Sequence, residues 1–217
     1  MIKYLEIHKE NTITFDPQEL YLSPELQQDA LEKGRALHSL YPDANDEIPP
    51  NAPEPRGRHV QVNCFVDSDH AGDRITRRSH TGIILYVNKA PISWFSKRQN
   101  TVESSTFGSE FVALRIATEQ IISLKYKLRM FGVKVDGYAN VFCDNESVFK
   151  NATLAESRLK KKHNSICFHR VRESVAASIM MPFKVGTDFN LADILTKSLS
   201  ADRRKKLRLM IMPQHNQ

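Results

Sequence analysis

The alternation of hydrophobic and polar positions first predicts a short strand over residues 60–67. Val60, Val62, Cys64 and Val66 fall on one face, and Gln61, Asn63, Phe65 and Asp67 fall on the other. A period of two is typical of a β-strand with one face on a core. The strand runs into Asp67-Ser68-Asp69-His70-Ala71-Gly72. Acids at a strand end fit a metal or catalytic site, but Asp and Gly are also ordinary turn residues, so this stretch alone leaves both interpretations open.

Two further strands are predicted directly after this one. Residues 82–87 form a dense apolar run, Asn88-Lys89 fits a tight turn, and residues 91–97 alternate again around Trp94. Three strands with short connections predict an antiparallel meander.

The strongest helical pattern lies over residues 104–132. Ser104-Ser105-Thr106 fits its start and Gly132 its end. Glu110 falls inside the apolar stripe, where a carboxylate is costly unless a metal ion or a hydrogen-bonding group accompanies it. Glu119 falls outside the stripe and is expected in solvent. The stripe consists of residues that recur every three or four positions: Phe107, Phe111, Leu114, Ala117, Ile121, Leu124, Leu128 and Phe131.

The later part of the chain alternates strands and helices. Strands are predicted over 139–144 and 180–185, and helices over 145–151 and 159–177. Two more helices are predicted to begin near 190 and 203. The order βββαβααβα predicts an α/β fold, in which helices cover a mixed sheet.

Residues 1–58 are predicted to form a separate lead-in. Ser23-Pro24-Glu25 carries the signals of a helix start, so a helix is expected from there to Leu40. Residues 48–57 are rich in proline and predict an extended linker. We therefore place the domain boundary after residue 58, with the second domain covering 59–217.

Charge and cysteine content narrow the class of protein. Residues 1–58 hold 6 Lys and Arg against 11 Asp and Glu, whereas residues 59–217 hold 25 against 14. The excess of positive charge in the second part suggests a polyanionic partner, with a solvated basic surface as the alternative. The cysteines show no CxxC spacing, which favours free thiols in a reducing compartment. No apolar run is long enough to cross a membrane, so no membrane partner is expected.

Four acids share one kind of position: Asp67, Glu110, Asp144 and Asp193 each lie at a strand end or on a helix that faces the sheet. Carboxylates brought together repel one another, and hard divalent cations relieve that repulsion. Oxygen ligands favour Mg²⁺ or Mn²⁺, and two such ions about 4 Å apart suit phosphodiester hydrolysis. A basic domain with such a site predicts a nuclease.

The chain from Phe65 onward resembles the ribonuclease H domain of copia-like (LTR) retrotransposon Pol polyproteins. Residues 1–58 resemble more loosely the tail of the reverse transcriptase and its connection to that domain. The matching pieces occur in the family's order: Val66-Asp67-Ser68-Asp69-His70-Ala71-Gly72, Thr76-Arg77-Arg78-Ser79-His80-Thr81-Gly82, Ser93-Trp94-Phe95-Ser96-Lys97-Arg98-Gln99, Ser109-Glu110-Phe111-Val112-Ala113-Leu114, Cys143-Asp144-Asn145 and Asn190-Leu191-Ala192-Asp193-Ile194-Leu195-Thr196-Lys197.

This resemblance implies a ribonuclease H-like fold, with a mixed five-stranded sheet of three antiparallel strands followed by parallel strands, and helices on both faces. It implies a metal-dependent endonuclease that hydrolyses the RNA strand of RNA–DNA hybrids during reverse transcription, with two Mg²⁺ ions and Mn²⁺ as the alternative. Asp67, Glu110, Asp144 and Asp193 match the family's catalytic, metal-binding acids.

The implied partners are the hybrid and the reverse-transcriptase portion of the same polyprotein. The expected location is cytoplasmic, within retrotransposon particles, with the nucleus as the alternative. The sequence leaves the oligomeric state open.

Basic residues supply candidate contacts to nucleic acid. A Lys run is predicted at a helix start, where the helix dipole disfavours it, and this favours a binding role. Asn145 is expected to cap a helix and to help position the hybrid. Asp69 is expected to support the site, Glu103 to cap a helix or lie on the surface, and Asp188 to lie in a loop. The basic candidates are Arg74, Arg77, Arg78, Lys97, Arg98, Lys160, Lys161 and Lys162.

Three other interpretations compete with a hybrid-cutting ribonuclease, and one of them is a related nuclease. A non-catalytic nucleic-acid-binding or connection domain of a Pol polyprotein is the main one. An integrase or transposase core ranks lower, because the last acid here is Asp193 and not a helical Glu. Zinc at His163, Cys167 and His169 fits no standard spacing.

Two motifs are absent from the sequence. The chain lacks a Tyr-x-Asp-Asp motif, so DNA polymerisation is not expected of it. Residues 184–189 lack the His found before the last acid of many cellular ribonucleases H.

Overall fold

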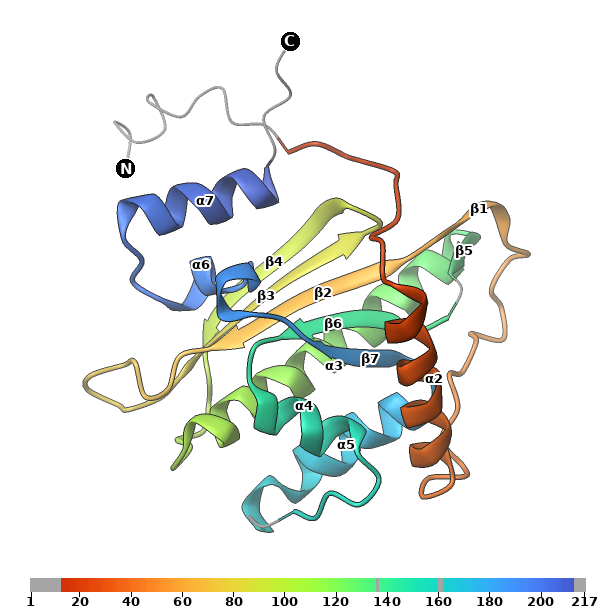
Figure 1. Cartoon of the computed structure of the whole chain (residues 1–217). Coiled ribbons are helices and arrows are strands. Elements are labelled where there is room, and N and C mark those ends of the chain that lie inside the picture. The colour runs from red at the N-terminus through yellow and green to blue at the C-terminus, as the bar shows by residue number, and fades with distance from the viewer. Residues whose placement is uncertain (1–12, 136, 160–161, 213–217) are drawn as a thin grey trace.

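The computed structural model describes residues 13–135, 137–159 and 162–212. Its centre is a five-stranded sheet in the order β4-β3-β2-β6-β7 (Figure 1). Strands β2, β3 and β4 are antiparallel, and β6 and β7 continue the sheet in parallel with β2. This confirms the predicted mixed α/β sheet. The bounds are β2 Val62–Ser68, β3 His80–Val87, β4 Ala90–Arg98, β6 Ala139–Cys143 and β7 Met180–Lys184.

A small parallel pair accompanies the main sheet. It joins β1, Arg56–Val60, to β5, Val133–Val135. The strand predicted over 60–67 is therefore two strands, β1 and β2, which are separated at Gln61. The main chain of Gln61 leaves the ladder there, because its N–H donates to Oδ1 of Asn88 at 2.8 Å. Strand β5 was not predicted, because three residues are too few to show a period of two.

Helices cover both faces of the sheet (Figure 1). One face carries the larger core, which includes Cys64 and Val66 of β2 and Phe111 of α3. The other face carries a smaller core, in which Ile84 of β3 packs with Leu207. Strand β2 is consequently buried on both sides. The helices on the first face are α2 Pro24–His38, α3 Thr106–Met130, α4 Glu146–Thr153 and α5 Ser165–Ala176, and those on the second are α6 Asp193–Thr196 and α7 Ala201–Ile211.

Helix α3 begins as predicted and ends as predicted before Gly132, which has φ of +71°, but the last residue of the predicted stripe is not buried. The hydroxyl of Ser105 caps it by accepting from the N–H of Gly108 at 3.2 Å. At the other end, Phe131 is exposed instead of completing the stripe. Lys125 is buried there, because its ammonium donates to Asp46 at 2.6 Å and to two backbone carbonyls. Ion pairing, which hydrophobic periodicity cannot show, accounts for the burial of Lys125.

Two predicted helices begin later than expected. The helix expected over 159–177 is α5, and it starts at Ser165 after a 3₁₀ turn, Lys162–Asn164. Lys160 and Lys161 lie outside the described residues, and Lys162 precedes the helix, so the argument from the helix dipole does not apply to it. The helix expected from residue 190 is a 3₁₀ turn at Thr187–Phe189 followed by the single turn of α6.

The described part of residues 1–58 packs on the rest of the chain. Leu37 of α2 is fully buried in the larger core, and α2 contacts α5. Asp46 accepts from Arg129 of α3 at 2.9 Å as well as from Lys125. The boundary after residue 58 stays a prediction, and β1 runs across it. Among the described helices, none has the length and hydrophobicity needed to cross a membrane.

Candidate metal centre

Asp67 lies at the end of β2, the middle strand of the sheet, and its side chain is fully buried. Strands β3 and β6 flank β2, and helices cover both faces of the sheet, which accounts for the burial of Asp67. One carboxylate oxygen accepts from the hydroxyl of Thr196, and the other lies 3.2 Å from the ammonium of Lys197. Asp67 is therefore held in one orientation.

Glu110 and Asp144 reach the same place from other elements. Glu110 projects from the first half of α3 and is 7% exposed, while Asp144 follows the last residue of β6. Asp67, Glu110 and Asp144 each offer an oxygen, and these three oxygens lie within 4.8 Å of one another. The parallel pairing of β2 with β6 brings the two strand-end acids to one edge. The structure thus brings together three of the four acids selected from the sequence.

Asp193, the fourth acid, is nearby but is engaged by cations. It is the first residue of α6 and is 2% exposed. One of its oxygens lies 2.7 Å from the ammonium of Lys197, and the other lies 3.3 Å from the guanidinium of Arg203. It does not complete the three-oxygen cluster. The sequence selected Asp193 by motif but did not predict these two ion pairs.

Asn190 ties the loop before α6 to the two strand-end acids. It is fully buried, and its amide donates to the carbonyl of Val66 at 3.0 Å and to Asp144 at 3.4 Å. Its side-chain oxygen accepts from the N–H of Ala192 at 3.2 Å. Asn190 is therefore a positioning residue for which the motif itself indicates no role. The only signal in the sequence is an amide side chain three residues before Asp193.

Lys197 was also quoted only as part of a motif, yet its ammonium lies among the acids. It is 3.2 Å from Asp67, 2.7 Å from Asp193 and 4.0 Å from Asp144. Lys197 follows Asp193 by four residues, the spacing at which side chains of opposite charge meet on a helix. That spacing was visible in the sequence.

The carboxylates have perturbed proton affinities. Burial raises the pKa of Glu110 well above its ordinary value, and the charges of Asp67 and Asp144 raise it further. Burial also raises the pKa of Asp67, although the Thr196 hydrogen bond and Lys197 act against it. Burial would lower the pKa of Lys197, but its hydrogen bond to Asp193 and the charge of Asp67 outweigh this and raise it. Without a bound cation, Glu110 is thus costly to ionise.

The donor set fits a hard divalent cation. The cluster consists of carboxylate oxygens from buried or half-buried side chains, and it has neither thiol nor imidazole ligands among the described residues. Such a set suits Mg²⁺ or Mn²⁺ and not zinc. Asp67, Glu110 and Asp144 would hold the first ion, and the positive charge of the ion would offset the cost of ionising Glu110.

The predicted nucleic-acid contacts lie in several places. Arg74 and Arg77 are exposed in the loop that follows β2, and Lys97 is exposed on β4. Arg98 is exposed but pairs with Asp73, and Arg78 is half-buried. Lys162 is exposed before α5, whereas Lys160 and Lys161 are not among the described residues. Asn145 caps α4, because its oxygen accepts from the N–H groups of Ser147 and Val148 at 3.0 and 3.2 Å.

Asp69 and Glu103 form contacts that hold the segments around the site together. Asp69 accepts from the backbone N–H of His80 and pairs with its ring at 3.3 Å, so it closes the loop between β2 and β3. Glu103 was expected to cap a helix or lie on the surface. It is instead 7% exposed, because it packs beside α3 and faces His163 at 3.3 Å. Asp188 lies in the 3₁₀ turn and pairs with Arg203 at 2.7 Å.

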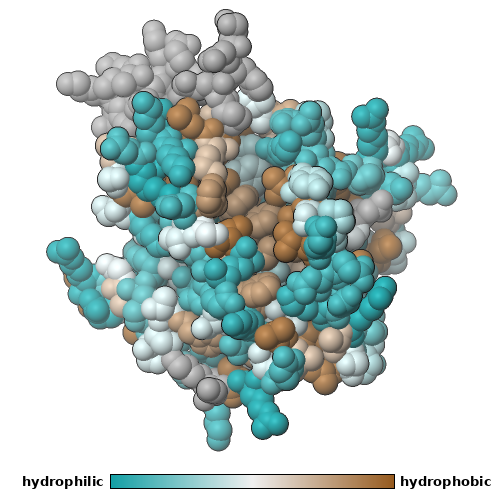
Figure 2. Space-filling model, viewed as in Figure 1, coloured by the Kyte–Doolittle hydropathy of each residue, from teal (hydrophilic) through white to brown (hydrophobic). Residues whose placement is uncertain are grey.

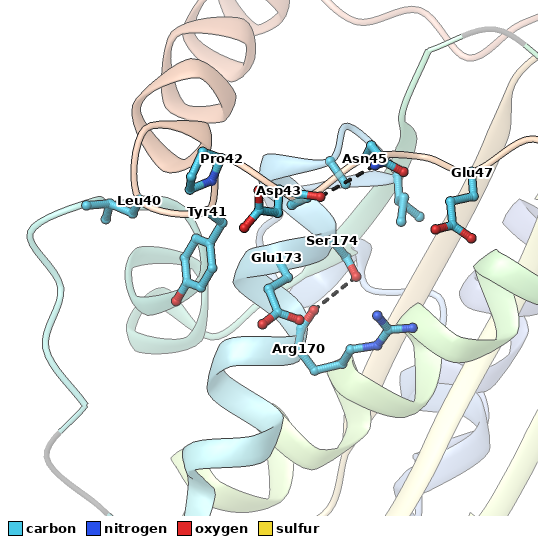
Figure 3. A pocket seen from close by; sticks show the side chains of 12 residues that line it. Leu40, Tyr41, Pro42, Asp43, Asn45, Glu47, Arg170, Glu173 and Ser174 are labelled. Carbon is cyan, nitrogen blue, oxygen red and sulfur yellow. Dashed lines mark hydrogen bonds between the residues drawn. The ribbon is translucent and has the colours of Figure 1, made fainter.

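Two pockets lie apart from the acids. One of about 430 Å³ is lined by Phe65, Tyr86 and Phe142 of the sheet and by Met210 of α7. In the view of Figure 2, hydrophobic side chains lie between polar ones in the middle of the face turned to the viewer. The other, of about 400 Å³, lies between residues 40–47 and α5, and its lining includes Asp43, Glu47, Arg170 and Glu173 (Figure 3). None of the four acids of the metal centre lines either pocket.

Comparison with known proteins agrees with this fold. No family model matches the chain. The chain is 33% identical over 133 residues to the retrovirus-related Pol polyprotein from transposon TNT 1-94 of Nicotiana tabacum, which covers 61% of this chain. It is 28% identical over 145 residues to that from transposon RE1 of Arabidopsis thaliana, which covers 67% of this chain. The chain spans about a tenth of the length of these curated relatives, 10% in each case.

Among solved structures, the chain is similar to LC11-RNase H1 in complex with an RNA/DNA hybrid. The TM-score is 0.50 at 16% identity, over 63% of this chain and 94% of that chain. This likeness shows a ribonuclease H-like fold. Together with the Pol polyprotein relatives, it confirms the resemblance predicted from the motifs.

Proposed function

We propose that this chain is a metal-dependent endonuclease that cuts the RNA strand of RNA–DNA hybrids. The observation that carries the proposal is the cluster of Asp67, Glu110 and Asp144, whose oxygens lie within 4.8 Å of one another. Buried carboxylates gathered in this way are costly, so their convergence on one edge of the sheet points to a cation. The ribonuclease H-like fold and the Pol polyprotein relatives support the choice of substrate.

The chain's own residues have distinct tasks in this proposal. Asp67, Glu110 and Asp144 hold the first divalent ion, and Asp193 is the ligand that remains for a second. Bound Mg²⁺ supplies an activated water and stabilises the leaving oxygen. Thr196 fixes the orientation of Asp67, and Asn190 fixes Asp144 and the start of α6.

Binding of the hybrid is assigned to the exposed basic residues. Arg74, Arg77 and Lys97 are exposed around the meander. Contacts of such residues with phosphates fix the register and add salt-dependent affinity, but they read no base sequence. The proposed setting is a Pol polyprotein of a retrotransposon, where the reverse-transcriptase portion is the partner and cytoplasmic particles are the location.

A strand-specific cleavage assay tests the proposal. The protein is mixed with hybrids that carry a label on either the RNA or the DNA, in Mg²⁺ or with a chelator. We expect the RNA strand to be cleaved and the DNA strand to stay intact. Cleavage should occur with Mg²⁺ and should be absent with the chelator. Asp144→Asn should abolish cleavage while hybrid binding persists, and Asp29→Asn, on the exposed surface of α2, should cut like the parent. If Asp144→Asn cuts as fast as the parent, the assignment is wrong.

The second candidate is a non-catalytic nucleic-acid-binding or connection domain. The observation that favours it is that Lys197 and Arg203 already engage Asp193. This candidate predicts hybrid binding without cleavage at every Mg²⁺ or Mn²⁺ concentration. The same assay therefore separates the two.

A further inference from the structure

The ammonium of Lys197 occupies one side of the acidic centre. It lies 2.7 Å from an oxygen of Asp193 and 3.2 Å from one of Asp67, but 4.0 Å from the nearest oxygen of Asp144. The cation is therefore not shared equally. It pairs closely with Asp67 and Asp193 and meets Asp144 only at the outer limit of an ion pair. Lys197 therefore offsets the charge of the side formed by Asp67 and Asp193 more than that of the side formed by Glu110 and Asp144.

Both oxygens of Asp193 are engaged in the same way. Lys197 binds one oxygen, and Arg203 lies 3.3 Å from the other. Arg203 also donates to Asp188 and to the carbonyl of Thr187, so it is held by its own partners. A metal ion that takes Asp193 as a ligand must consequently displace one of two cations, and Lys197 is the one with fewer other contacts.

The position of Lys197 in the chain allows such an exchange. Its side chain is 34% exposed, so the ammonium has a route to solvent. It directly follows the last residue of α6, with φ of −113° and extended backbone. Because it is tethered four residues from Asp193, its local concentration at the site is high and does not depend on the solution. A tethered cation of this kind competes with any soluble ion for the same oxygens.

We propose that Lys197 is a built-in counter-ion which competes with a divalent ion for the Asp67–Asp193 side of the centre. The two sides then differ in metal affinity: an ion held by Asp67, Glu110 and Asp144 binds first, and an ion that needs Asp193 binds more weakly. The inference rests on the proposed function, because it takes these acids to be metal ligands. It adds a regulatory property to that site, namely that ion binding at one side is opposed by the protein itself.

A structural ion pair alone predicts something different. If Lys197 only stabilises the fold, its removal lowers stability and either leaves metal affinity unchanged or weakens it through local disorder. If Lys197 competes with the ion, its removal lowers the stability of the metal-free protein but strengthens metal binding. The signs of the two effects on affinity are opposite.

The test is Mn²⁺ binding by the full chain without nucleic acid. The free-Mn²⁺ signal in electron paramagnetic resonance gives the number and affinity of bound ions. We compare the parent with Lys197→Met, with Lys197→Gln as a second neutral variant, and with Lys127→Met, an exposed lysine of α3, as the control. Circular dichroism verifies that each is folded, and thermal unfolding is measured with a chelator and with Mn²⁺.

We expect Lys197→Met and Lys197→Gln to lower the dissociation constant of the weaker Mn²⁺ site by about tenfold or more. A titration resolves such a change readily. Their unfolding temperature should fall in chelator and rise more than the parent's on addition of Mn²⁺. The control should match the parent. The proposal is overturned if the folded neutral variants bind Mn²⁺ no more tightly than the parent, including the case in which none of the proteins binds it.

This experiment separates the two proposals. Unchanged Mn²⁺ binding together with RNA cleavage by the parent rejects the role of Lys197 and keeps the nuclease. Tighter binding by the neutral variants without cleavage by the parent keeps the competition and rejects the nuclease.

Discussion

A β-carbon on Gly82 would lie 2.9 Å from the carbonyl oxygen of Ala192. It would also lie 2.7 Å from Cγ2 of Thr196 and 2.9 Å from Cβ of Leu195. Gly82 is opposite Asp67 in the pairing of β3 with β2, so α6 rests directly on the strand pair that carries the first acid. The missing side chain at this position lets Asp193 and Lys197 approach Asp67.

Gly82→Ala should therefore displace α6 from the sheet. Overpacking of this kind costs about 1–3 kcal/mol of unfolding free energy. We expect Mn²⁺ binding and RNA cleavage to fall by at least about tenfold, because small displacements of ligands are costly to a site. Gly186→Ala is the matched control, since its β-carbon would only touch Phe189 at 3.5 Å. Equal binding and cleavage by the two variants would contradict the role of Gly82.

Glu110→Gln should stabilise the metal-free protein. Burial and neighbouring acids raise the pKa of Glu110, so ionisation of this group works against folding as pH rises above about 4.3. A neutral amide removes that cost, and we expect a gain of about 1–2 kcal/mol near pH 7 in chelator. Thermal unfolding checks this, with the exposed Glu119→Gln of the same helix as control. A lower unfolding temperature for Glu110→Gln would count against the electrostatic account.

Asp46→Asn should destabilise the protein, and the effect should depend on pH. Burial alone would raise the pKa of Asp46, but hydrogen bonds from Arg129 and Lys125 lower it. A lowered pKa adds stability above the unfolded-state value near 3.9, and this stability is lost as pH falls through the folded-state value. We expect a loss of about 3 kcal/mol at pH 7, because Lys125 is left buried without its carboxylate.

Chemical denaturation at several pH values measures this effect. The difference between the parent and Asp46→Asn should shrink as pH falls below about 4. Asp43→Asn changes an exposed acid of the same segment and should stay close to the parent at every pH. A constant difference across the pH range would mean that packing, and not the ion pairs, holds this segment.

Arg172→Met should also be costly. Arg172 is 2% exposed, and its guanidinium donates to the carbonyls of Asn151, Leu154 and Ala155 at 2.7–3.0 Å. These carbonyls lie in the last turn of α4 and directly after it, so removal of the guanidinium leaves partly buried acceptors without a donor. We expect a loss of about 3 kcal/mol in denaturant unfolding.

The control for this change is Arg170→Met, on the same helix. Arg170 pairs with Glu119 at the surface, where such a pair contributes less than about 1 kcal/mol. If the two variants lose equal stability, the carbonyl contacts of Arg172 are not important to the fold.

Much of the fold could be predicted because local patterns agree with it. The alternation before Asp67, the apolar run of β3 and the stripe around Glu110 each continue through most of an element. Capping signals at Ser23 and Ser105 placed two helix starts correctly. Strand β5 was not predicted, and the helix predicted from residue 190 is only the single turn of α6, since short elements depend on tertiary contacts and not on periodicity.

The ion pairs were not predicted from the sequence. Motifs selected the acids, but a motif does not say which acid meets which cation. Lys197 was visible four residues after Asp193, whereas Arg203 reaches Asp193 only because α7 packs beside α6. Lys125 and Asp46 are 79 residues apart, so their contact follows from the packing of two distant segments.

The residues of the metal centre are synthesised in a fixed order. Asp67, Glu110 and Asp144 belong to segments that leave the ribosome before β7, whereas Asp193 and Lys197 follow it. A growing chain that ends just after Asp144 contains the three clustered acids but not Lys197. Strand β6 is then the outer strand of the sheet, because its neighbour β7 is not yet made. Chains fold largely as whole units after synthesis of the parts they need. The proposed RNA cleavage should therefore appear in one late step of synthesis, after residue 197 has emerged.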